Sequence, residues 1–350
     1  MIKKLGIGCF WKCPFRCKQC YSSASSGKDV SNWSFSELKQ IADKFCPHVD
    51  DLNYGTGEPI FNGNALPMMN YVAGTYPKVS QGITTNGYSI IAIAPSTVKG
   101  LFHDVDVSVD FATERQHNEM RQHKKAWQWA NEALEILVSI RVPRSLTTCL
   151  TSEHTDKDIA KLLEMAKKYK AAWRINWFRH AGRGPAYFRL SAQRAWDVIR
   201  FLSDKVTFQC LDSIFTGPLG LPSMPCPAGQ QSARIHGDMD ITAYPFLIGR
   251  QWSAGNALSP ECTLETIYNS EAFRRLRERQ VPECDSCPYW LACRGGCVTR
   301  AALHNGGINK RDDYCPVTAG VKFEDINVEF QRIGDFVHEG YLCTTIVQPK

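Results

Sequence analysis

The amino-terminal part of the chain contains the stretch Cys13-Pro-Phe-Arg-Cys17-Lys-Gln-Cys20, directly after a short apolar segment. Three thiolates at this spacing can hold three irons of a four-iron cluster, which leaves the fourth iron free for another ligand. Zinc or disulfides are the alternatives, but a single cysteine triple leaves tetrahedral zinc one ligand short. The spacing therefore predicts an iron–sulfur cluster with one open coordination position.

The chain of 350 residues contains 15 cysteines, and about half of them fall in two compact clusters, at 13–20 and 284–297. Metal binding explains such clusters better than disulfides, so we expect a reducing compartment and a cytoplasmic protein. The apolar run after Met1 is too short for a signal peptide, and no stretch is long enough to cross a membrane. The net charge of +6 is spread along the chain without an aromatic-basic platform, which argues against nucleic-acid binding.

Residues 2–209 alternate short apolar runs with amphipathic stretches, which is the pattern of repeated βα units around a parallel sheet. The predicted strands are Ile2–Gly8, Asp51–Tyr54, Val79–Thr84, Val105–Asp110, Leu146–Leu150, Trp173–Trp177 and Val206–Gln209. Helices are predicted after the capping box Ser34–Glu37 and at Ala126–Ile140, Asp156–Tyr169 and Ser191–Leu202. About six units predict an α/β fold, a partial (β/α)6 TIM-like barrel whose active site lies at the carboxyl ends of the strands.

The pattern changes after residue 209. Residues 210–320 are rich in proline, glycine and cysteine and too irregular to fold by side-chain burial alone, so we expect a small cysteine-rich domain that is organised by metal. The apolar and acidic stretch Val321–His338 predicts one helix packed against the body. The expected organisation is a barrel at 1–209, an auxiliary domain at 210–320, and a carboxyl-terminal helix and tail at 321–350.

A glycine-rich loop, Gly55-Thr-Gly-Glu-Pro59, follows the second predicted strand, and its glycines free the backbone to approach a ligand closely. Together with the cysteine triple, this loop resembles the radical SAM superfamily, whose GGEP loop binds the amino group of S-adenosylmethionine (SAM). The resemblance covers the whole barrel region. It implies an enzyme in which a [4Fe–4S] cluster cleaves SAM to a 5′-deoxyadenosyl radical, and this radical abstracts a hydrogen atom from the substrate.

The resemblance also implies roles for single residues. The catalytic cluster would be held by Cys13, Cys17 and Cys20. The predicted SAM-binding residues are Gln19, Gly55, Thr56, Gly57, Glu58, Asn86, Ser108 and Arg121. Thr56 stands where a glycine is commonest in the family, and Gln19 stands where an aromatic residue usually stacks on the adenine. For each of these side chains, an ordinary turn or a surface ion pair is the alternative.

The second cysteine cluster has the spacing Cys284-x2-Cys287-x5-Cys293-x3-Cys297 and is followed by Cys315. It resembles the SPASM domain, an auxiliary-cluster module of radical SAM enzymes. By that resemblance, Cys284, Cys287, Cys293 and Cys315 would ligate one auxiliary [4Fe–4S] cluster, and Cys297 would turn toward another auxiliary site. A zinc knuckle is the alternative.

That other auxiliary site departs from the family, because Tyr244 stands where a cysteine is expected. Only Cys226 and Cys297 remain as ligands there, unless Cys210 or Cys262 joins them. Two thiolates hold a four-iron cluster poorly, so we expect one auxiliary cluster, as in the reduced twitch variant, and about eight irons per chain. Cys210 is also the candidate catalytic thiol, a hydrogen-atom donor of the kind that radical SAM epimerases use; a buried structural cysteine is the alternative.

Three classes of function follow. The first is an oxidoreductase that crosslinks, oxidises or epimerises a peptide, since SPASM-type clusters commonly accompany peptide modification in this family. The second is a dehydrogenase or epimerase of a sugar or aminocyclitol in natural-product biosynthesis. A non-catalytic iron–sulfur or zinc protein is a remote third, because a SAM-type glycine loop has no use in an electron carrier. The expected partners are a flavodoxin- or ferredoxin-type reductant and a separate peptide-recognition protein, and substrate recognition is expected near Arg179, His180 and Arg183.

Overall fold

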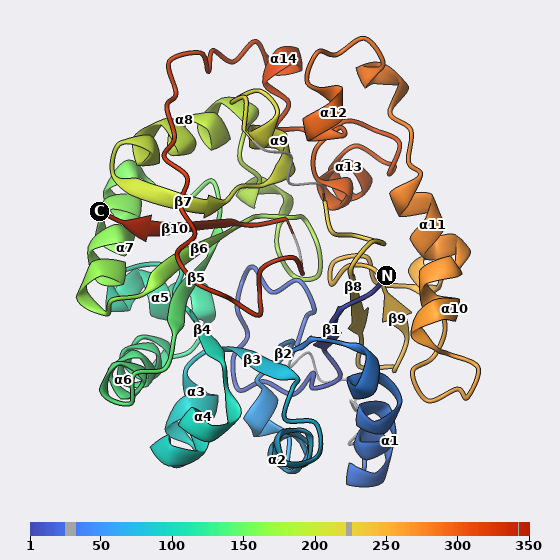
Figure 1. Ribbon diagram of the computed structural model, residues 1–350. Helices are drawn as coiled ribbons and strands as arrows, with labels where there is room; N and C mark the ends of the chain where they lie inside the picture. The colour runs from blue at the N-terminus through green and yellow to red at the C-terminus, as the bar shows by residue number, and fades with distance from the viewer. Residues whose placement is uncertain (25–32, 222–225, 342) are drawn as a thin grey trace.

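The computed structural model describes residues 1–24, 33–221, 226–341 and 343–350. One ten-stranded sheet runs through it in the order β7-β10-β6-β5-β4-β3-β2-β1-β8-β9, and Figure 1 shows this sheet curving round a central space. The strands are β1 (Lys4–Ile7), β2 (Asp51–Tyr54), β3 (Ser80–Thr85), β4 (Asp104–Ser108), β5 (Arg144–Leu150), β6 (Ala172–Trp177), β7 (Val206–Cys210), β8 (Ser232–Ile235), β9 (Ile241–Thr242) and β10 (Thr345–Pro349).

Strands β1 to β6 are parallel neighbours in chain order, and their registers follow one another without a break from Lys4↔Asp51 to Leu150↔Trp177. Each crossover carries helical structure, which is the connection that parallel pairing requires. All seven strands predicted from residues 2–209 form within two residues of their predicted ends. The predicted α/β fold with a partial TIM-like barrel is therefore confirmed.

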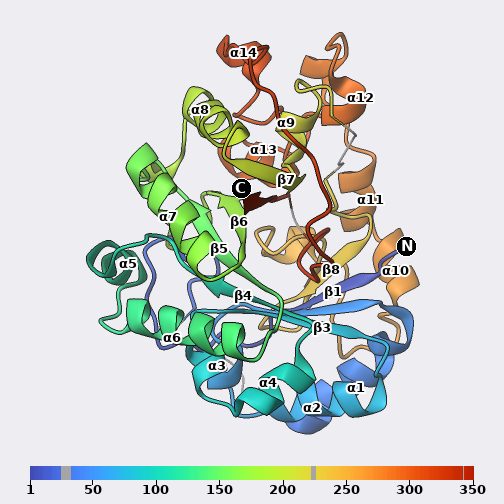
Figure 2. The ribbon, with the colours of Figure 1, turned by 60° about the vertical axis from the view of Figure 1, so that its left-hand side comes forward.

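The helices of the barrel lie on the outer face of the sheet, as Figures 1 and 2 show. They are α1 (Phe35–Phe45), α2 (Ala65–Thr75), α3 (Tyr88–Ile91), α4 (Pro95–Leu101), α5 (Glu114–Arg121), α6 (Ala126–Ser139), α7 (Asp156–Lys168) and α8 (Ala192–Ser203). The first helix shows why they form. Ser34 and Glu37 make the predicted capping box, and the buried residues Leu38, Ile41, Ala42 and Phe45 follow at helical spacing.

The cysteine-rich part of the chain continues the barrel sheet rather than standing apart from it. Strand β8 pairs in parallel with β1, from Lys4↔Ser232 to Ile7↔Ile235, and β9 pairs antiparallel with β8. The remaining helices are short: α9 (Ser213–Thr216), α10 (Leu264–Asn269), α11 (Glu271–Arg277), α12 (Trp290–Cys293), α13 (Val298–His304) and α14 (Pro316–Ala319). Five 3-10 turns are described as well: Cys46–His48, Pro59–Phe61, Ala186–Phe188, Arg250–Trp252 and Pro282–Cys284. None of the helices in the described ranges is long and apolar enough to span a bilayer.

The prediction of a helix at Val321–His338 is wrong. The described residues of this stretch run without a helix beside β7, where the Phe208 backbone donates to Glu329 O at 2.8 Å and accepts from Gln331 N at 2.9 Å. The reason lies in β7, whose edge presents backbone groups that an extended neighbour satisfies and a helix does not. The chain then forms β10, which pairs antiparallel with both β6 and β7 and separates them.

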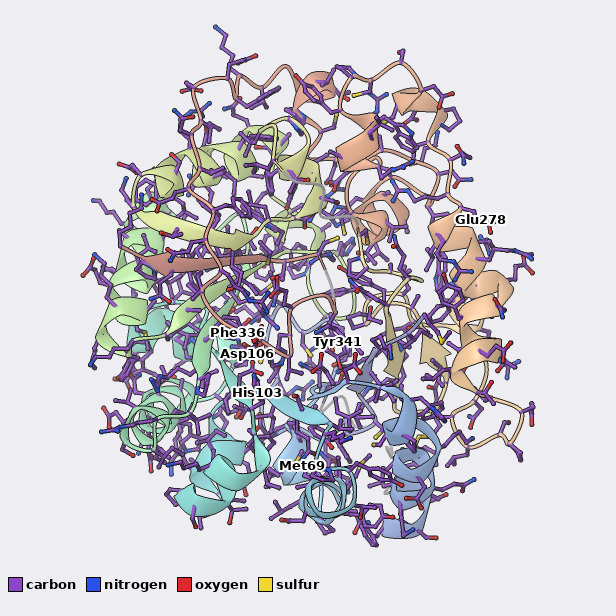
Figure 3. All side chains as sticks on the ribbon, viewed as in Figure 1. Met69, His103, Asp106, Glu278, Phe336 and Tyr341 are labelled. Atoms are coloured by element: carbon purple, nitrogen blue, oxygen red, sulfur yellow. The ribbon has the colours of Figure 1, made fainter. Side chains whose placement is uncertain are left out.

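The same segment lines the inside of the barrel near the amino ends of its strands. Val337 N donates to Asp104 Oδ1 at 3.0 Å, and Tyr341 Oη donates to Leu5 O at 2.8 Å and to Asp51 O at 3.0 Å. Gly82 makes room for the segment, since a Cβ there would lie 2.8 Å from the Val337 Cβ. In Figure 3, Tyr341 and Asp106 lie in the central region that the strands surround, whereas Glu278 points outward beside α11. This end of the barrel is filled, which leaves the carboxyl ends of the strands for a ligand.

Candidate active site

The three cysteines of the amino-terminal triple lie in the loop after β1 and line one cavity of about 200 Å³ at the carboxyl ends of the strands. Several donors point at their sulfurs. Phe15 N lies 3.4 Å from Cys13 Sγ, and Asn86 Nδ2 lies 3.7 Å from it. Arg121 Nη1 lies 3.9 Å from Cys17 Sγ. Hydrogen bonds to sulfur are a means by which proteins tune iron–sulfur clusters.

Aromatic rings pack against the other side of the cysteine loop. Phe15 stacks on His123 at a centroid distance of 4.4 Å and on Trp129 at 5.5 Å, and these rings cover the loop. Burial raises the pKa of Cys17 to about 11, with Arg121 opposing the rise, and burial also raises the pKa of Cys13. The free thiols of Cys13 and Cys17 are therefore protonated at neutral pH, and binding a metal must displace their protons. Three convergent sulfurs in a covered loop fit an iron–sulfur cluster.

The glycine-rich loop after β2 packs directly against the cysteine loop. Gly57 has a φ of +65°, and a Cβ at this position would lie 2.0 Å from Phe10 O. No side chain fits there, so the sequence needs glycine. Glu58 N donates to Lys12 O at 2.9 Å and completes the contact between the two loops. Gly55, Thr56 and Gly57 line the same cavity as the cysteine triple.

The Glu58 side chain does not line that cavity. Its fully buried carboxylate accepts hydrogen bonds from Asn86 N at 2.8 Å, Ser89 N at 2.9 Å and Thr85 Oγ1 at 2.5 Å, and also from Ser89 Oγ. Burial raises the pKa of Glu58, and these donors oppose the rise. The side chain thus fixes the glycine-rich loop to the end of β3, while the backbone of the loop faces the cavity.

The other predicted SAM-binding residues meet around Asp110, beyond the end of β4. Gln19 Nε2 donates to Asp110 Oδ2 at 2.5 Å, and Arg121 Nε lies 2.6 Å from the same oxygen. Burial alone would lower the pKa of Arg121, but the carboxylate of Asp110 outweighs this effect. The pKa is raised above its ordinary value, and the guanidinium stays charged. Within the described residues Gln19 Oε1 is buried without a hydrogen-bond partner. Ser108 and Asn86 line the cavity beside this group.

Two residues that line the cavity, Arg234 and Tyr21, were not predicted from the sequence. Arg234 on β8 donates to Thr56 Oγ1 at 2.6 Å, and Tyr21 Oη lies 2.8 Å from that oxygen. Both Gly6 and Gly8 lie under the Arg234 side chain, with added Cβ atoms 2.5 Å from its Cδ and 2.6 Å from its Nε. Two glycines two residues apart, which share one face of the strand, are the feature of the sequence from which this close approach could have been predicted.

The carboxyl-terminal segment adds His338 to the cavity wall. His338 Nδ1 lies 3.0 Å from Asp104 Oδ2, and Nε2 lies 3.0 Å from Thr84 Oγ1. Burial lowers the pKa of His338 to about 3, so the ring is neutral at physiological pH. Of the residues expected to recognise substrate, Arg179 and Arg183 line the cavity, whereas His180 is exposed.

The predicted auxiliary ligands also converge. Cys284, Cys287, Cys293 and Cys315 line one small cavity together with Tyr289 and Arg311. Tight turns bring them together, since Cys287 N donates to Cys284 O at 2.9 Å and Cys293 N donates to Tyr289 O at 2.9 Å. Four thiols around one space suit a fully ligated iron–sulfur cluster or a zinc ion.

Cys226 and Cys297 each lie near Cys343, and neither of the thiols that the sequence suggested as their companions packs there. Cys210 packs with Ala172 and Ile346, and its Sγ faces Thr344 O at 3.5 Å. Cys262 is buried beside Gly255. Cys210 does not line the main cavity, so the structure favours the structural alternative over the predicted hydrogen-atom donor.

Residues 11–166, which carry the cysteine loop and the glycine-rich loop, match the family model described as the Radical SAM superfamily. The chain therefore carries a radical SAM domain over these residues. Mycofactocin maturase MftC of Mycolicibacterium smegmatis is 28% identical to it over 303 residues, which cover 82% of this chain and 76% of MftC.

Solved structures share the fold of this radical SAM enzyme. The structure of anSMEcpe with bound AdoMet superposes with a TM-score of 0.70 at 16% identity and covers 92% of both chains. Streptococcus suis SuiB bound to precursor peptide SuiA superposes with a TM-score of 0.63 at 15% identity, over 90% of this chain and 76% of SuiB. The predicted resemblance to the radical SAM superfamily is confirmed. A [4Fe–4S] cluster and SAM follow from the family.

The radical SAM site can be tested at Glu58. Replacing Glu58 by Gln places an amide N–H₂ group among donors that need an acceptor, and we expect a loss of about 1–3 kcal/mol in the free energy of unfolding together with weaker SAM binding. Chemical denaturation and equilibrium dialysis with SAM measure the two effects. Glu119→Gln is the matched control, because exposed Glu119 forms a surface ion pair with Lys18, and it should change neither quantity. An E58Q variant that is as stable as the wild type would contradict the anchoring role.

Proposed function

We propose that this radical SAM enzyme modifies a peptide. The observation that carries the proposal is the single cavity shared by the cysteine triple, the glycine-rich loop and a wall of polar side chains at the carboxyl ends of the strands. The relatives supply the class of substrate, since SuiB is a solved neighbour bound to a precursor peptide and MftC is described as a maturase. When bound, the cluster and SAM supply the 5′-deoxyadenosyl radical.

The proposed roles follow the geometry. Cys13, Cys17 and Cys20 would hold the catalytic cluster. The backbone of Gly55 to Gly57 would receive the amino group of SAM, and Glu58 would act as a positioning residue behind it. Gln19, Asn86, Ser108 and Arg121 would surround the rest of the cofactor, with the unpartnered oxygen of Gln19 available to a donor such as the adenine amino group.

An auxiliary [4Fe–4S] cluster would be bound by Cys284, Cys287, Cys293 and Cys315. Four thiolates satisfy all four irons, so this cluster would be closed to further ligands and suited to accepting or passing one electron. We propose a flavodoxin- or ferredoxin-type protein as the source of the electron for the catalytic cluster. A separate peptide-recognition protein would present the substrate at the cavity.

The peptide proposal is tested with a choice of substrates. Reconstituted, reduced enzyme is incubated with SAM and either peptides encoded by short reading frames beside its gene or a pool of sugars and aminocyclitols. We expect one peptide to increase 5′-deoxyadenosine formation and to change in mass. The Cys13→Ala variant is the control, and it should give neither signal. Stimulation by the sugar pool alone would replace the peptide proposal by the small-molecule alternative.

The iron content of the protein tests the proposed auxiliary cluster. Cys287→Ala should remove about four irons per chain, the content of one [4Fe–4S] cluster, and leave cleavage of SAM in the absence of substrate intact. Iron and zinc are measured by elemental analysis after anaerobic reconstitution. Cys46→Ala, which alters a buried thiol outside the amino-terminal triple and the auxiliary group, should lose no iron. Loss of one zinc in place of iron would show a zinc knuckle.

A further inference from the structure

The wall of the main cavity carries positive charge that no carboxylate of the wall balances. The arginines that line the cavity are Arg121, Arg174, Arg179, Arg183 and Arg234, and among the described residues no aspartate or glutamate lines it. Arginine keeps its charge in proteins. A cavity lined by one sign of charge attracts a ligand of the opposite sign, so this cavity favours a substrate with an anionic group.

Most of these arginines already have partners in the body of the protein. Three of them each pair with one buried aspartate: Arg121 with Asp110 at 2.6 Å, Arg174 with Asp106 at 2.5 Å, and Arg179 with Asp212 at 3.5 Å. Arg183 is half-buried and donates to backbone carbonyl groups of Cys17 and Ala24. The charge of the cavity that is left for a ligand therefore lies elsewhere in the wall.

Arg234 on β8 differs from the other arginines of the cavity. It is only 7% exposed, and within the described ranges of the chain it forms no ion pair with a carboxylate. Its Nη2 donates to Thr56 Oγ1 at 2.6 Å, whereas its Nε has no hydrogen-bond partner among the described residues. A buried cation without an anion is costly, and an unused buried donor in a cavity indicates a missing ligand atom.

Asn53 on β2 adds a second unused donor beside Arg234. Gly6 of β1 is the register partner of both residues, so the three positions form one row across β8, β1 and β2. The Arg234 side chain lies over Gly6, where an added Cβ would be 2.5 Å from its Cδ, and its Nη1 lies 3.5 Å from Asn53 Oδ1. The Nδ2 of Asn53 is buried without a hydrogen-bond partner among the described residues. The strands thus fix both donors before a ligand arrives.

Unused N–H donors around a buried positive charge suit a carboxylate, whose two oxygens accept several hydrogen bonds. SAM also has a carboxylate, but Ser108 and Arg121, which are predicted to bind SAM, lie at β4 and beyond it, and β3, β2 and β1 separate β4 from β8. We propose that Arg234 and Asn53 bind a carboxylate of the peptide substrate, either its terminal carboxylate or an aspartate or glutamate side chain. This inference rests on the proposed function and deepens it, because it names the group of the peptide that the cavity recognises.

Peptides with and without each carboxylate test the inference. The probes are the peptides encoded by short reading frames beside the gene, each synthesised as the free acid, as the carboxyl-terminal amide, and with each aspartate or glutamate replaced by asparagine or glutamine. With wild-type reconstituted enzyme at saturating SAM, we expect one neutral form to raise KM about ten- to a hundredfold, the effect of losing a charge-assisted hydrogen bond. The form that does so identifies the source of the carboxylate.

The Arg234→Gln variant separates recognition of the carboxylate from a structural role of the arginine. Because this variant also loses a donor to Thr56, the acid and the neutral peptide are compared within each variant. The ratio of their KM values should fall to about one in Arg234→Gln and to an intermediate value in Arg234→Lys, which keeps the charge without the planar donors. Asn53→Ala should lower the ratio as well, and it serves as the test if Arg234→Gln does not fold. Arg200→Gln is the matched control, because Arg200 forms a surface ion pair with Asp197 on α8, and it should keep the wild-type ratio.

Three results would overturn the inference. The first is a KM ratio near one in the wild type for a peptide that is turned over, which would leave the proposed function intact. The second is an Arg234→Gln ratio equal to that of the wild type. The third is a loss of SAM affinity in Arg234→Gln, measured by equilibrium dialysis, together with an unchanged peptide ratio, which would assign Arg234 to the carboxylate of SAM. If no peptide is turned over at all, the proposed function and this inference fail together.

Discussion

The contact between two loops is the constraint on which the site depends. The loop after β1 carries the three cysteines, the loop after β2 carries the glycines, and the backbones of the two loops meet at Gly57 and Phe10 with no space for a side chain. A hydrogen bond from Glu58 N to Lys12 O holds them at that distance. Because adjacent parallel strands end at the same edge of the sheet, the order β1-β2-β3 brings the cysteine loop, the glycine-rich loop and the Glu58 anchor side by side.

Buried charges join the cysteine-rich region to the barrel. Arg300 on α13 binds Asp212 just after β7 and Asp312 before Cys315, and all three residues are buried. Removing one partner of such a group costs about 3–5 kcal/mol, because the remaining charge is left unpaired in the interior. The network therefore fixes where Cys315 lies relative to the barrel, and with it the proposed auxiliary cluster.

The sequence predicted most of the barrel because short apolar or β-branched runs alternate with amphipathic helical stretches, as at Val105–Asp110 and Ala126–Ile140. It failed at Val321–His338, where the apolar residues serve an extended segment beside β7 that no local pattern reveals. It also missed Arg234, His338 and Cys343 as neighbours of functional groups. Each of these reaches its site through strand pairing or chain segments far away in sequence, which spacing rules do not encode.

The central claim is that the amino-terminal triple holds a cluster that cleaves SAM. The most direct measurement compares wild type with a Cys13→Ala, Cys17→Ala, Cys20→Ala triple variant, both reconstituted anaerobically and reduced with dithionite in the presence of SAM. The account predicts 5′-deoxyadenosine from wild type, none from the variant, and a difference of about four irons per chain. A wild-type protein that binds iron but forms no 5′-deoxyadenosine, or a variant that still forms it, would contradict the account.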